Sequence, residues 1–231
     1  RHRGFIPWDD DFDFGMIRNQ YERFLKIAPH ELGEQFFLQT WDNDKGYGLP
    51  FAKIRKNGTL YIEEMTEKCS CHQGIFIDIF PYDDLPKDIN AQKRQGKILT
   101  FLKVLIKAKC NARPAYASRT FEFIKFCKYL PFLISSKFLK KSFLVNRYDS
   151  IAQKYDTQNT GVLYCQCSSQ YARVTIPTRV FQKTIELAFE DTVFRAPEDY
   201  NQYLTNAYGD YMTPPPIDQR GDRHQVKCVE F

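Results

Sequence analysis

The sequence predicts an α+β fold, and three observations support this class. Short apolar runs bounded by Gly, Asn and Pro, at residues 51–55, 59–62 and 74–80, have a composition typical of strands. Between residues 93 and 109, apolar residues recur at helical spacing with lysines between them. The chain of 231 residues is 43% hydrophobic and 26% charged, which allows one large core and excludes a disordered protein.

Helical periodicity marks four other segments, which we expect to be helices: residues 18–27, 121–145, 179–189 and 199–208. Pro131 is expected to break the second of these, because proline lacks a backbone N–H and clashes with the preceding turn. The run Pro214–Pro216 would stop any helix near the C-terminus. A further strand is expected at residues 162–167. No apolar run approaches the roughly 18 residues of a membrane span, which argues against an integral membrane protein.

The net charge of +5 combines two parts of opposite sign. Residues 87–150 contain 15 Lys and Arg against 3 Asp and Glu, whereas the remainder contains 18 against 25. This asymmetry favours an acidic catalytic or ion-binding part beside a basic interaction part. The basic face, which includes Lys137, Lys140 and Lys141, either lies on an anionic membrane or polymer or is the solvated side of a helical insertion.

The seven cysteines are an odd number in a chain too long to need disulfide staples, which indicates free thiols in a reducing cytoplasm. Two local pairs, Cys69 with Cys71 and Cys165 with Cys167, have C-x-C spacing. Because structural zinc usually takes cysteines separated by two to four residues, we expect ordinary reduced thiols rather than a zinc site.

The strongest local feature is a run rich in aspartate close to the N-terminus. If this run is a strand, alternation places Asp9, Asp11 and Asp13 on one face, with Phe12 and Phe14 on the other. Carboxylates one pleat repeat apart repel each other unless a cation lies between them, and hard cations such as Mg²⁺ take oxygen ligands. The two phenylalanines would anchor the strand to a core.

Two alternatives to a metal site at this run are weaker. A calcium loop of the EF-hand type requires Gly and Glu at the sixth and twelfth positions, but counting from Asp9 these are Phe14 and Gln20. A solvated acidic turn is disfavoured by Trp8 and the phenylalanines within the run. The pattern therefore predicts metal binding.

A single carboxylate, Asp78, interrupts the apolar strand expected at residues 74–80. A buried carboxylate must shift its pKa, find a cation, or occupy an exposed position on an edge strand. A metal shared with Asp11 and Asp13 would satisfy it. Two acids at alternate spacing with a third on a later strand are the arrangement that two-metal phosphoryl or nucleotidyl transfer needs.

Four segments, in the expected order, resemble the hallmark motifs of the LicD family: Arg1–Met16, Phe51–Arg55, Gly74–Pro81 and the stretch Tyr203–Pro215. The resemblance runs from Arg1 to about His224 and is weakest across the basic helical stretch. In that family a segment Gly-Thr-Leu-Leu-Gly normally precedes the position of Arg1 and helps to cradle the donor's phosphates. Because the chain starts with Arg1 rather than Met, we expect it to be a fragment or a trimmed chain.

The resemblance implies a nucleotidyltransferase-like mixed sheet flanked by helices, with a basic helical insertion. It implies one catalytic domain over residues 1–231, divided into an acidic metal-binding core (1–86), the basic insertion (87–160) and a C-terminal strand and helices (161–231). The implied activity is transfer of phosphocholine, or a related alcohol phosphate, from a CDP-activated donor to a sugar hydroxyl of a cell-surface polysaccharide, teichoic acid or lipopolysaccharide. The similar fukutin-related proteins use CDP-ribitol.

Residue by residue, the resemblance implies that Asp11 and Asp13 are the family's metal-binding acid pair, with Mg²⁺ or Mn²⁺ as the metal. Asp78 matches the third acid, which is a metal ligand and the base for the acceptor hydroxyl. Asp9 matches an acid that flanks the metal site. We therefore take Asp11, Asp13 and Asp78 as the catalytic candidates.

Other residues are candidates for substrate binding. Lys53 and Arg55, two apart on a strand, are suited to contact the donor's phosphates together, although a solvated strand face explains them equally well. Trp8 is suited to stack on a base or a choline cation, or to serve in the core. Arg220 and His224 follow the proline stop and are candidates to return to the site, with a surface or structural role as the first interpretation of His224.

We expect CDP-choline or a similar CDP-alcohol as donor, a surface-glycan or lipid-linked acceptor, and no nucleic acid. The expected location is the cytoplasm, with peripheral contact at the inner face of an anionic membrane. Two alternatives stay open: a nucleotidyltransferase that attaches a nucleotide and releases pyrophosphate, and a non-catalytic fragment that binds glycan or membrane.

Overall fold

The computed structural model describes residues 2–9, 11–112, 119–165, 175–221 and 225–231, with the backbone alone for residues 119–128. The helices are α1 (Arg18–Glu31), α2 (Ile89–Lys109), α3 (Arg119–Phe138), α4 (Lys141–Ala152) and α5 (Tyr200–Tyr208), with 3₁₀ turns at Gln153–Tyr155, Thr178–Phe181 and Ile217–Gln219. The strands are β1 (Asp13–Ile17), β2 (Phe36–Gln39), β3 (Ala52–Lys56), β4 (Leu60–Glu63), β5 (Phe76–Asp84), β6 (Val162–Tyr164), β7 (Ile176–Pro177), β8 (Thr184–Phe189), β9 (Thr192–Pro197) and β10 (Val226–Glu230). These elements confirm the α+β class.

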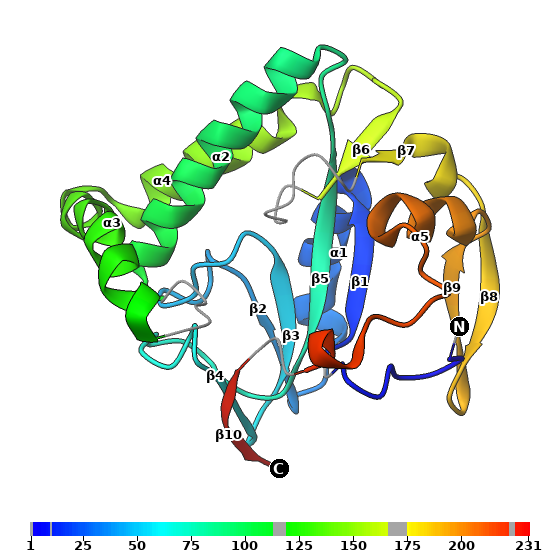
Figure 1. Cartoon of the computed structure of the whole chain (residues 1–231), viewed down its shortest axis with the longest axis horizontal. Coiled ribbons are helices and arrows are strands. Elements are labelled where there is room, and N and C mark those ends of the chain that lie inside the picture. The colour runs from blue at the N-terminus through cyan, green and yellow to red at the C-terminus, as the bar shows by residue number, and fades with distance from the viewer. Residues whose placement is uncertain (1, 10, 113–118, 166–174, 222–224) are drawn as a thin grey trace.

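Strand β5 is the centre of the main sheet (Figure 1). The sheet has the order β2-β3-β5-β6-β7 with antiparallel neighbours, and β1 pairs with β5 in parallel. The strands β4 and β10 form one separate antiparallel pair, and β8 and β9 form another. The three strands expected before residue 87 are present as β3, β4 and β5. The strand expected at 162–167 is present as β6, and residues 166 and 167 lie outside the described residues.

Helix α1 covers one face of this sheet and lies behind β1 and β5 in Figure 1. Its Tyr21 packs in a buried cluster with Phe14 of β1 and Ile79 of β5. Because successive strand residues point to opposite faces, Asp13 and Asp78 project from the face that α1 does not cover. The helix expected at residues 18–27 is thus confirmed.

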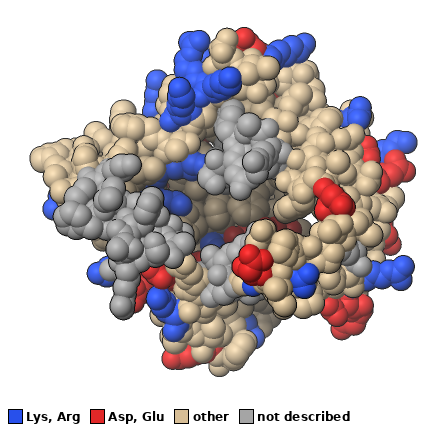
Figure 2. Space-filling view, viewed as in Figure 1, with Lys and Arg blue, Asp and Glu red and all other residues tan. Residues whose placement is uncertain are grey.

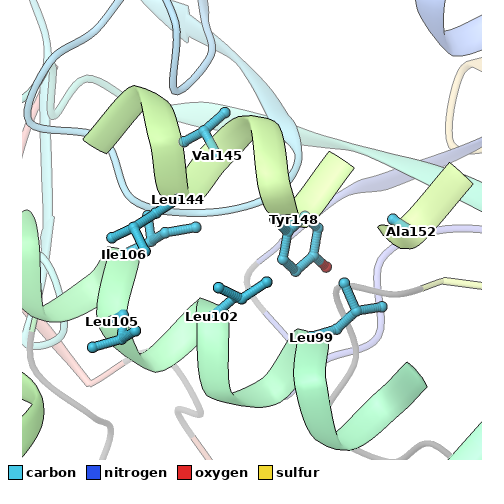
Figure 3. Packing of buried hydrophobic residues seen from close by; sticks show 8 residues of the cluster. All are labelled: Leu99, Leu102, Leu105, Ile106, Leu144, Val145, Tyr148 and Ala152. Atoms are coloured by element: carbon cyan, nitrogen blue, oxygen red, sulfur yellow. The ribbon is translucent and has the colours of Figure 1, made fainter. Parts of the chain in front are cut away.

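Helices α2, α3 and α4 form a layer to one side of the sheet (Figure 1). Figure 3 shows the cluster that α2 and α4 bury between them, which consists of Leu99, Leu102, Leu105, Ile106, Leu144, Val145, Tyr148 and Ala152. None of the helices in the described ranges has the length and apolar character needed to cross a bilayer.

Pro131 lies inside α3, so the helix break predicted at this proline is wrong. The break comes instead between Phe138 and Lys141, where α3 ends and α4 begins. A proline removes one helical hydrogen bond, and tertiary packing offsets that loss. The adjacent Phe132 packs on Phe101 of α2, with 5.6 Å between the ring centroids.

The helix predicted at residues 179–189 is also wrong. A short 3₁₀ turn is followed by a β-hairpin, in which β8 pairs with β9 in register from Thr184↔Pro197 to Phe189↔Thr192. Glu190 in the connecting turn has a positive φ of 49°, as tight hairpin turns require. Short apolar runs are compatible with both helical and strand periodicity. Here the pairing of β8 with β9 makes residues 184–189 a strand.

The helix predicted at residues 199–208 is confirmed as α5. The Asp199 side chain caps it by accepting a hydrogen bond from the Gln202 backbone N–H at 3.3 Å. The helix ends at Gly209, whose φ of 72° suits glycine, so it stops before the three prolines are reached.

Candidate functional site

Three neighbouring strands bring Asp13, Asp78 and Lys53 into one row. The parallel pairing of β1 with β5 sets Asp13 opposite Asp78, and the antiparallel pairing of β3 with β5 sets Lys53 opposite Asp78. Paired residues on adjacent strands share a face of the sheet and lie about 5 Å apart. The row therefore places two carboxylates and an ammonium group side by side on the face opposite α1.

This face of the molecule is hollowed. Figure 2, drawn from the same side as Figure 1, shows a depression over the centre of the sheet, with basic and acidic side chains around it. Asp13 is exposed, whereas Asp78 and Lys53 are buried. Of the three side chains in the row, that of Asp13 is therefore the most open to solvent.

Asp13 has a strongly perturbed carboxyl group. Burial on its protein side and the negative charges of Asp11 and Asp78 raise the pKa of Asp13 to about 7, while Lys53 opposes this shift. Asp9 adds a smaller effect in the same direction as the other acids. The carboxyl is crowded by protein and by like charge, yet its outer side is open to solvent. A cation placed among these oxygens would relieve the repulsion.

The prediction that the aspartate run is one strand is wrong for Asp9 and Asp11, because β1 begins only at Asp13. The Asp9 backbone N–H donates to the Ile6 carbonyl at 2.9 Å, which turns the chain before the strand. Asp11 precedes β1, so strand alternation does not set its direction. Both acids still lie near enough to Asp13 to affect its pKa.

Aromatic packing holds this run in place, as expected from its phenylalanines. Phe12 packs against Phe189 and Phe194 of the β8–β9 hairpin, with ring centroids 5.1 Å apart in both cases. Phe5 packs on Phe189 at 5.0 Å, and its backbone N–H donates to Glu190 Oε1 at 2.9 Å. The β8–β9 hairpin therefore holds in place the segment of residues 5–12, which precedes Asp13.

Lys53 forms an ion pair with Asp78. Its Nζ lies 2.9 Å from Asp78 Oδ1 and 3.9 Å from Glu63 Oε2, and the three side chains are 2%, 6% and 5% exposed. The ammonium also lies 3.2 Å from the centroid of the Phe76 ring. Burial raises the pKa of Asp78 and lowers that of Lys53, and the attraction between the two opposes both shifts.

Arg55 lies on the same face of β3 as Lys53 and is also buried. Its Nε donates to Gln39 Oε1 at 2.8 Å, and its Nη1 donates to the Gly74 carbonyl at 2.6 Å. These contacts rule out the solvated strand face as an explanation for Lys53 and Arg55. Contact of either residue with donor phosphates stays a prediction.

Trp8 and Arg220, which come from opposite ends of the chain, lie together. The Arg220 guanidinium carbon stands 4.4 Å from the Trp8 ring centroid, and its Nε donates to the Pro215 carbonyl at 2.7 Å. Arg220 thus returns towards the N-terminal run, as the sequence suggested. His224 lies outside the described residues.

Sequence reasoning missed three residues beside the row: Glu63, Tyr82 and Tyr203. The hydroxyl groups of Tyr82 on β5 and Tyr203 on α5 lie 2.7 Å apart. Burial raises the pKa of Tyr203 to about 12, with a small contribution from Asp13, so the pair stays protonated at neutral pH. For Tyr203, the sequence offered one indication of a role at the site, namely its place in the stretch that resembles a LicD motif. No feature of the sequence around Glu63 indicated a role at the site.

The carboxylates of the row suit a hard cation by chemistry. Asp13 and Asp78 are adjacent oxygen donors, and hard cations prefer oxygen ligands. Among the described residues, no three Asp, Glu, His or Cys side chains already converge as a metal cluster. A metal at Asp78 would therefore require Lys53 to give way, with Asp11 as a further oxygen donor close by.

The described cysteines are free thiols. A hydrogen bond between the Cys69 and Cys71 side chains, followed by burial, raises the pKa of Cys69. Cys165, directly after β6, is buried, and Cys167 of the same C-x-C pair lies outside the described residues. The expectation of reduced cysteines is therefore consistent with the described part of the chain.

The chain is similar in sequence to proteins of known function. Residues 1–106 match the family described as LicD/FKTN/FKRP, nucleotidyltransferase domain. The chain is 27% identical over 230 residues to the lipopolysaccharide cholinephosphotransferase LicD of Haemophilus influenzae, an alignment covering 97% of this chain and 82% of that protein. No solved structure matches the chain. These matches confirm the resemblance to the LicD family, and residues 1–106 include Asp9, Asp11, Asp13, Lys53, Arg55 and Asp78.

Proposed function

We propose, from the similarity to LicD and from the row of Asp13, Asp78 and Lys53, that this chain transfers phosphocholine from CDP-choline to a sugar hydroxyl of lipopolysaccharide or a related surface glycan. The observation that carries the proposal is the pairing of Asp13 with Asp78 on the face of the sheet opposite α1. A related CDP-alcohol would serve the same chemistry. The acceptor oxygen forms a bond to the phosphorus next to choline, and the bond from that phosphorus to CMP breaks.

In this mechanism Asp11 and Asp13 would hold the Mg²⁺ or Mn²⁺, with Asp78 as a further ligand. When bound, the metal neutralises charge on the donor phosphates and favours ionisation of the attacking hydroxyl. Asp78 would accept the proton of the acceptor hydroxyl as a general base. Burial raises the pKa of this carboxyl, and Lys53 opposes the shift. In the metal-free protein, Lys53 compensates the negative charge of Asp78.

Product analysis tests this proposal. The purified protein is incubated with Mg²⁺, lipopolysaccharide acceptor and a panel of CDP-alcohols, and CMP is measured by chromatography. We expect CMP release that Asp13→Asn abolishes and that Asp191→Asn, at the exposed hairpin turn, leaves unchanged. Pyrophosphate release from CTP in place of CMP would favour the nucleotidyltransferase alternative. Undiminished turnover in Asp13→Asn would contradict the mechanism.

We also propose that the layer of α2, α3 and α4 contacts an anionic membrane at the inner face, where a lipid-linked acceptor would lie. The support is a group of exposed apolar side chains interspersed with basic ones in this layer: Ile98, Phe101, Leu130, Ile134, Phe138, Phe143, Lys93, Lys97, Lys137 and Lys140. Basic amphipathic surfaces of this kind bind anionic headgroups. Lys141 has a different role, since its Nζ donates to the carbonyls of Trp41 and Asp44 at 2.6 and 3.0 Å.

Vesicle flotation tests the membrane contact. We expect the protein to float with vesicles containing phosphatidylglycerol and not with pure phosphatidylcholine. Changing Lys137 and Lys140 to Glu, or Phe138 to Ser, should abolish flotation, while Lys183→Glu on the 79% exposed Lys183 serves as the charge control. Binding that survives the first changes would contradict this surface as the contact.

A further inference from the structure

Lys53, a member of the row, lies near the carboxylates of both Asp78 and Glu63. Lys53 Nζ is 2.9 Å from Asp78 Oδ1 and 3.9 Å from Glu63 Oε2. All three side chains are at most 6% exposed, so water does not screen their interactions. Lys53 is therefore held in a closed site with one near acid and one farther acid.

Lys53 Nζ lies 2.9 Å from Asp78 Oδ1, so a divalent cation on either oxygen of this carboxylate would stand within a few ångströms of the ammonium group. Two cations that close to each other repel strongly in a buried site. Asp78 would have to release Lys53 when it takes up a metal, and a released lysine ammonium would need another partner, because an unpaired buried charge is costly.

Glu63 is placed to be that partner. A movement of about 1 Å, which shortens the Nζ–Oε2 distance from 3.9 Å towards 2.9 Å, would bring Lys53 into close contact with Glu63. The ammonium group lies 3.2 Å from the centroid of the Phe76 ring, and a shift of about 1 Å is small enough to keep this cation–π contact. The Arg55 guanidinium lies over the same ring at 4.8 Å.

We propose that Lys53 is the resident counter-cation of Asp78 in the metal-free protein and that Glu63 receives it when a divalent cation binds at Asp13 and Asp78. Lys53 and Glu63 are thus positioning residues that set the affinity of the site for metal. The inference rests on the proposed function, because it assumes the metal at the acidic row. It predicts opposite effects of the two residues, whereas a purely structural role predicts effects of the same sign.

Metal titration without donor or acceptor tests the inference. Mn²⁺ binding is measured by isothermal titration calorimetry, and the thermal midpoint is measured with and without Mn²⁺. In Glu63→Gln, Lys53 has no second partner and stays on Asp78, so Mn²⁺ affinity should fall about 10-fold or more, as for other residues that orient metal ligands. Glu63→Asp keeps a carboxylate and should restore part of this loss.

The lysine variant should behave in the opposite way. In Lys53→Met, Asp78 lacks its counter-cation, so the metal-free protein should melt at a lower temperature, and Mn²⁺ should raise the midpoint more than in the wild type. Affinity for Mn²⁺ should equal or exceed that of the wild type. Glu64→Gln is the matched control, because Glu64 follows Glu63 directly and pairs with Lys227 at 3.2 Å, away from Asp78.

These measurements test whether Lys53 moves from Asp78 to Glu63 when metal binds. Wild-type affinity in Glu63→Gln, or weakened Mn²⁺ binding in Lys53→Met, would overturn the exchange of Lys53 while leaving the proposed function intact. CMP release by a wild-type protein that binds no Mn²⁺ or Mg²⁺ would overturn both the metal in the proposed function and this inference. If Lys53→Met fails to fold, the comparison of Glu63→Gln with Glu63→Asp and Glu64→Gln still decides it.

Discussion

Asp13 and Asp78 lie directly opposite each other on parallel strands β1 and β5, although most of the N-terminal core separates them in the sequence. Two parallel strands that are neighbours in a sheet need a long connection. In the chain, the connection from β1 to β5 consists of α1, β2, β3 and β4. The pairing sets the exposed carboxyl of Asp13, whose pKa is raised to about 7, beside the buried, ion-paired Asp78. Four predictions follow from this arrangement and from the packing that supports it.

Asp13→Asn should separate activity from stability. The change removes a metal ligand and should lower CMP release by at least about 100-fold, as the loss of a charge at the reacting phosphate does. It also removes a carboxylate that Asp11 and Asp78 repel, so the thermal midpoint at pH 8 should be unchanged or higher. A midpoint well below that of the wild type would show that Asp13 serves mainly in folding.

Gly15→Ala should disturb the wall of the site. A Cβ at this position would lie 2.8 Å from Cε2 of the Tyr82 ring, whose hydroxyl contacts Tyr203. The ring must shift, at a cost of about 1–3 kcal/mol in free energy of unfolding. Urea denaturation measures this cost. In the double variant with Tyr82→Leu the two effects should not add, because the clash is absent. Full additivity would contradict the contact.

Asp83→Asn tests the ion pair that attaches α1 to β5. Arg18 Nη2 donates to Asp83 Oδ2 at 2.9 Å, and the Asp83 side chain is fully buried. Removing one partner of a buried pair leaves an uncompensated charge and should cost about 3 kcal/mol in free energy of unfolding. The control is Glu22→Gln, whose carboxylate meets Arg18 at 3.2 Å but is 43% exposed, so its loss should cost under about 1 kcal/mol.

Asp149 on α4 should make stability depend on pH. It lines a cavity of about 70 Å³ with Trp41 and Asp42. Burial, with Asp42 and Glu22 adding repulsion against an opposing Arg18, raises its pKa to about 7. The unfolded carboxyl loses its proton near pH 4 while the folded one keeps it, so stability falls as the pH rises from about 4 to 7.

Asp149→Asn removes this dependence. The variant should match the wild type near pH 4 and exceed it at pH 8 by on the order of 2 kcal/mol in free energy of unfolding, after allowance for solvent screening. Urea denaturation at several pH values measures the difference, with Asp191→Asn at the exposed hairpin turn as the control. Equal slopes for the wild type and Asp149→Asn would contradict the raised pKa.

Local patterns predicted much of the secondary structure, and the reasons for the failures are physical. Strands β3, β4 and β5 and helices α1, α2 and α5 follow from periodicity and from breakers such as Gly and Pro. The helix predicted at residues 179–189 failed because the pairing of β8 with β9 outweighed an ambiguous apolar period. The break predicted at Pro131 failed because α3 packs on α2 across it. Asp9 and Asp11 lie outside β1 because the chain turns before Asp13.

By itself the sequence determined the α+β class, the acidic run, the unusual position of Asp78 within an apolar strand and the resemblance to the LicD family. Only the tertiary structure decided that Asp78 pairs with Lys53, that Lys53 and Arg55 are both buried, and that Glu63 lies 3.9 Å from the Lys53 ammonium group. Secondary structure follows from neighbours a few residues apart, and the sequence shows these directly. The partner of a buried charge depends on the register between strands that meet only in the folded chain, and no local pattern records that register.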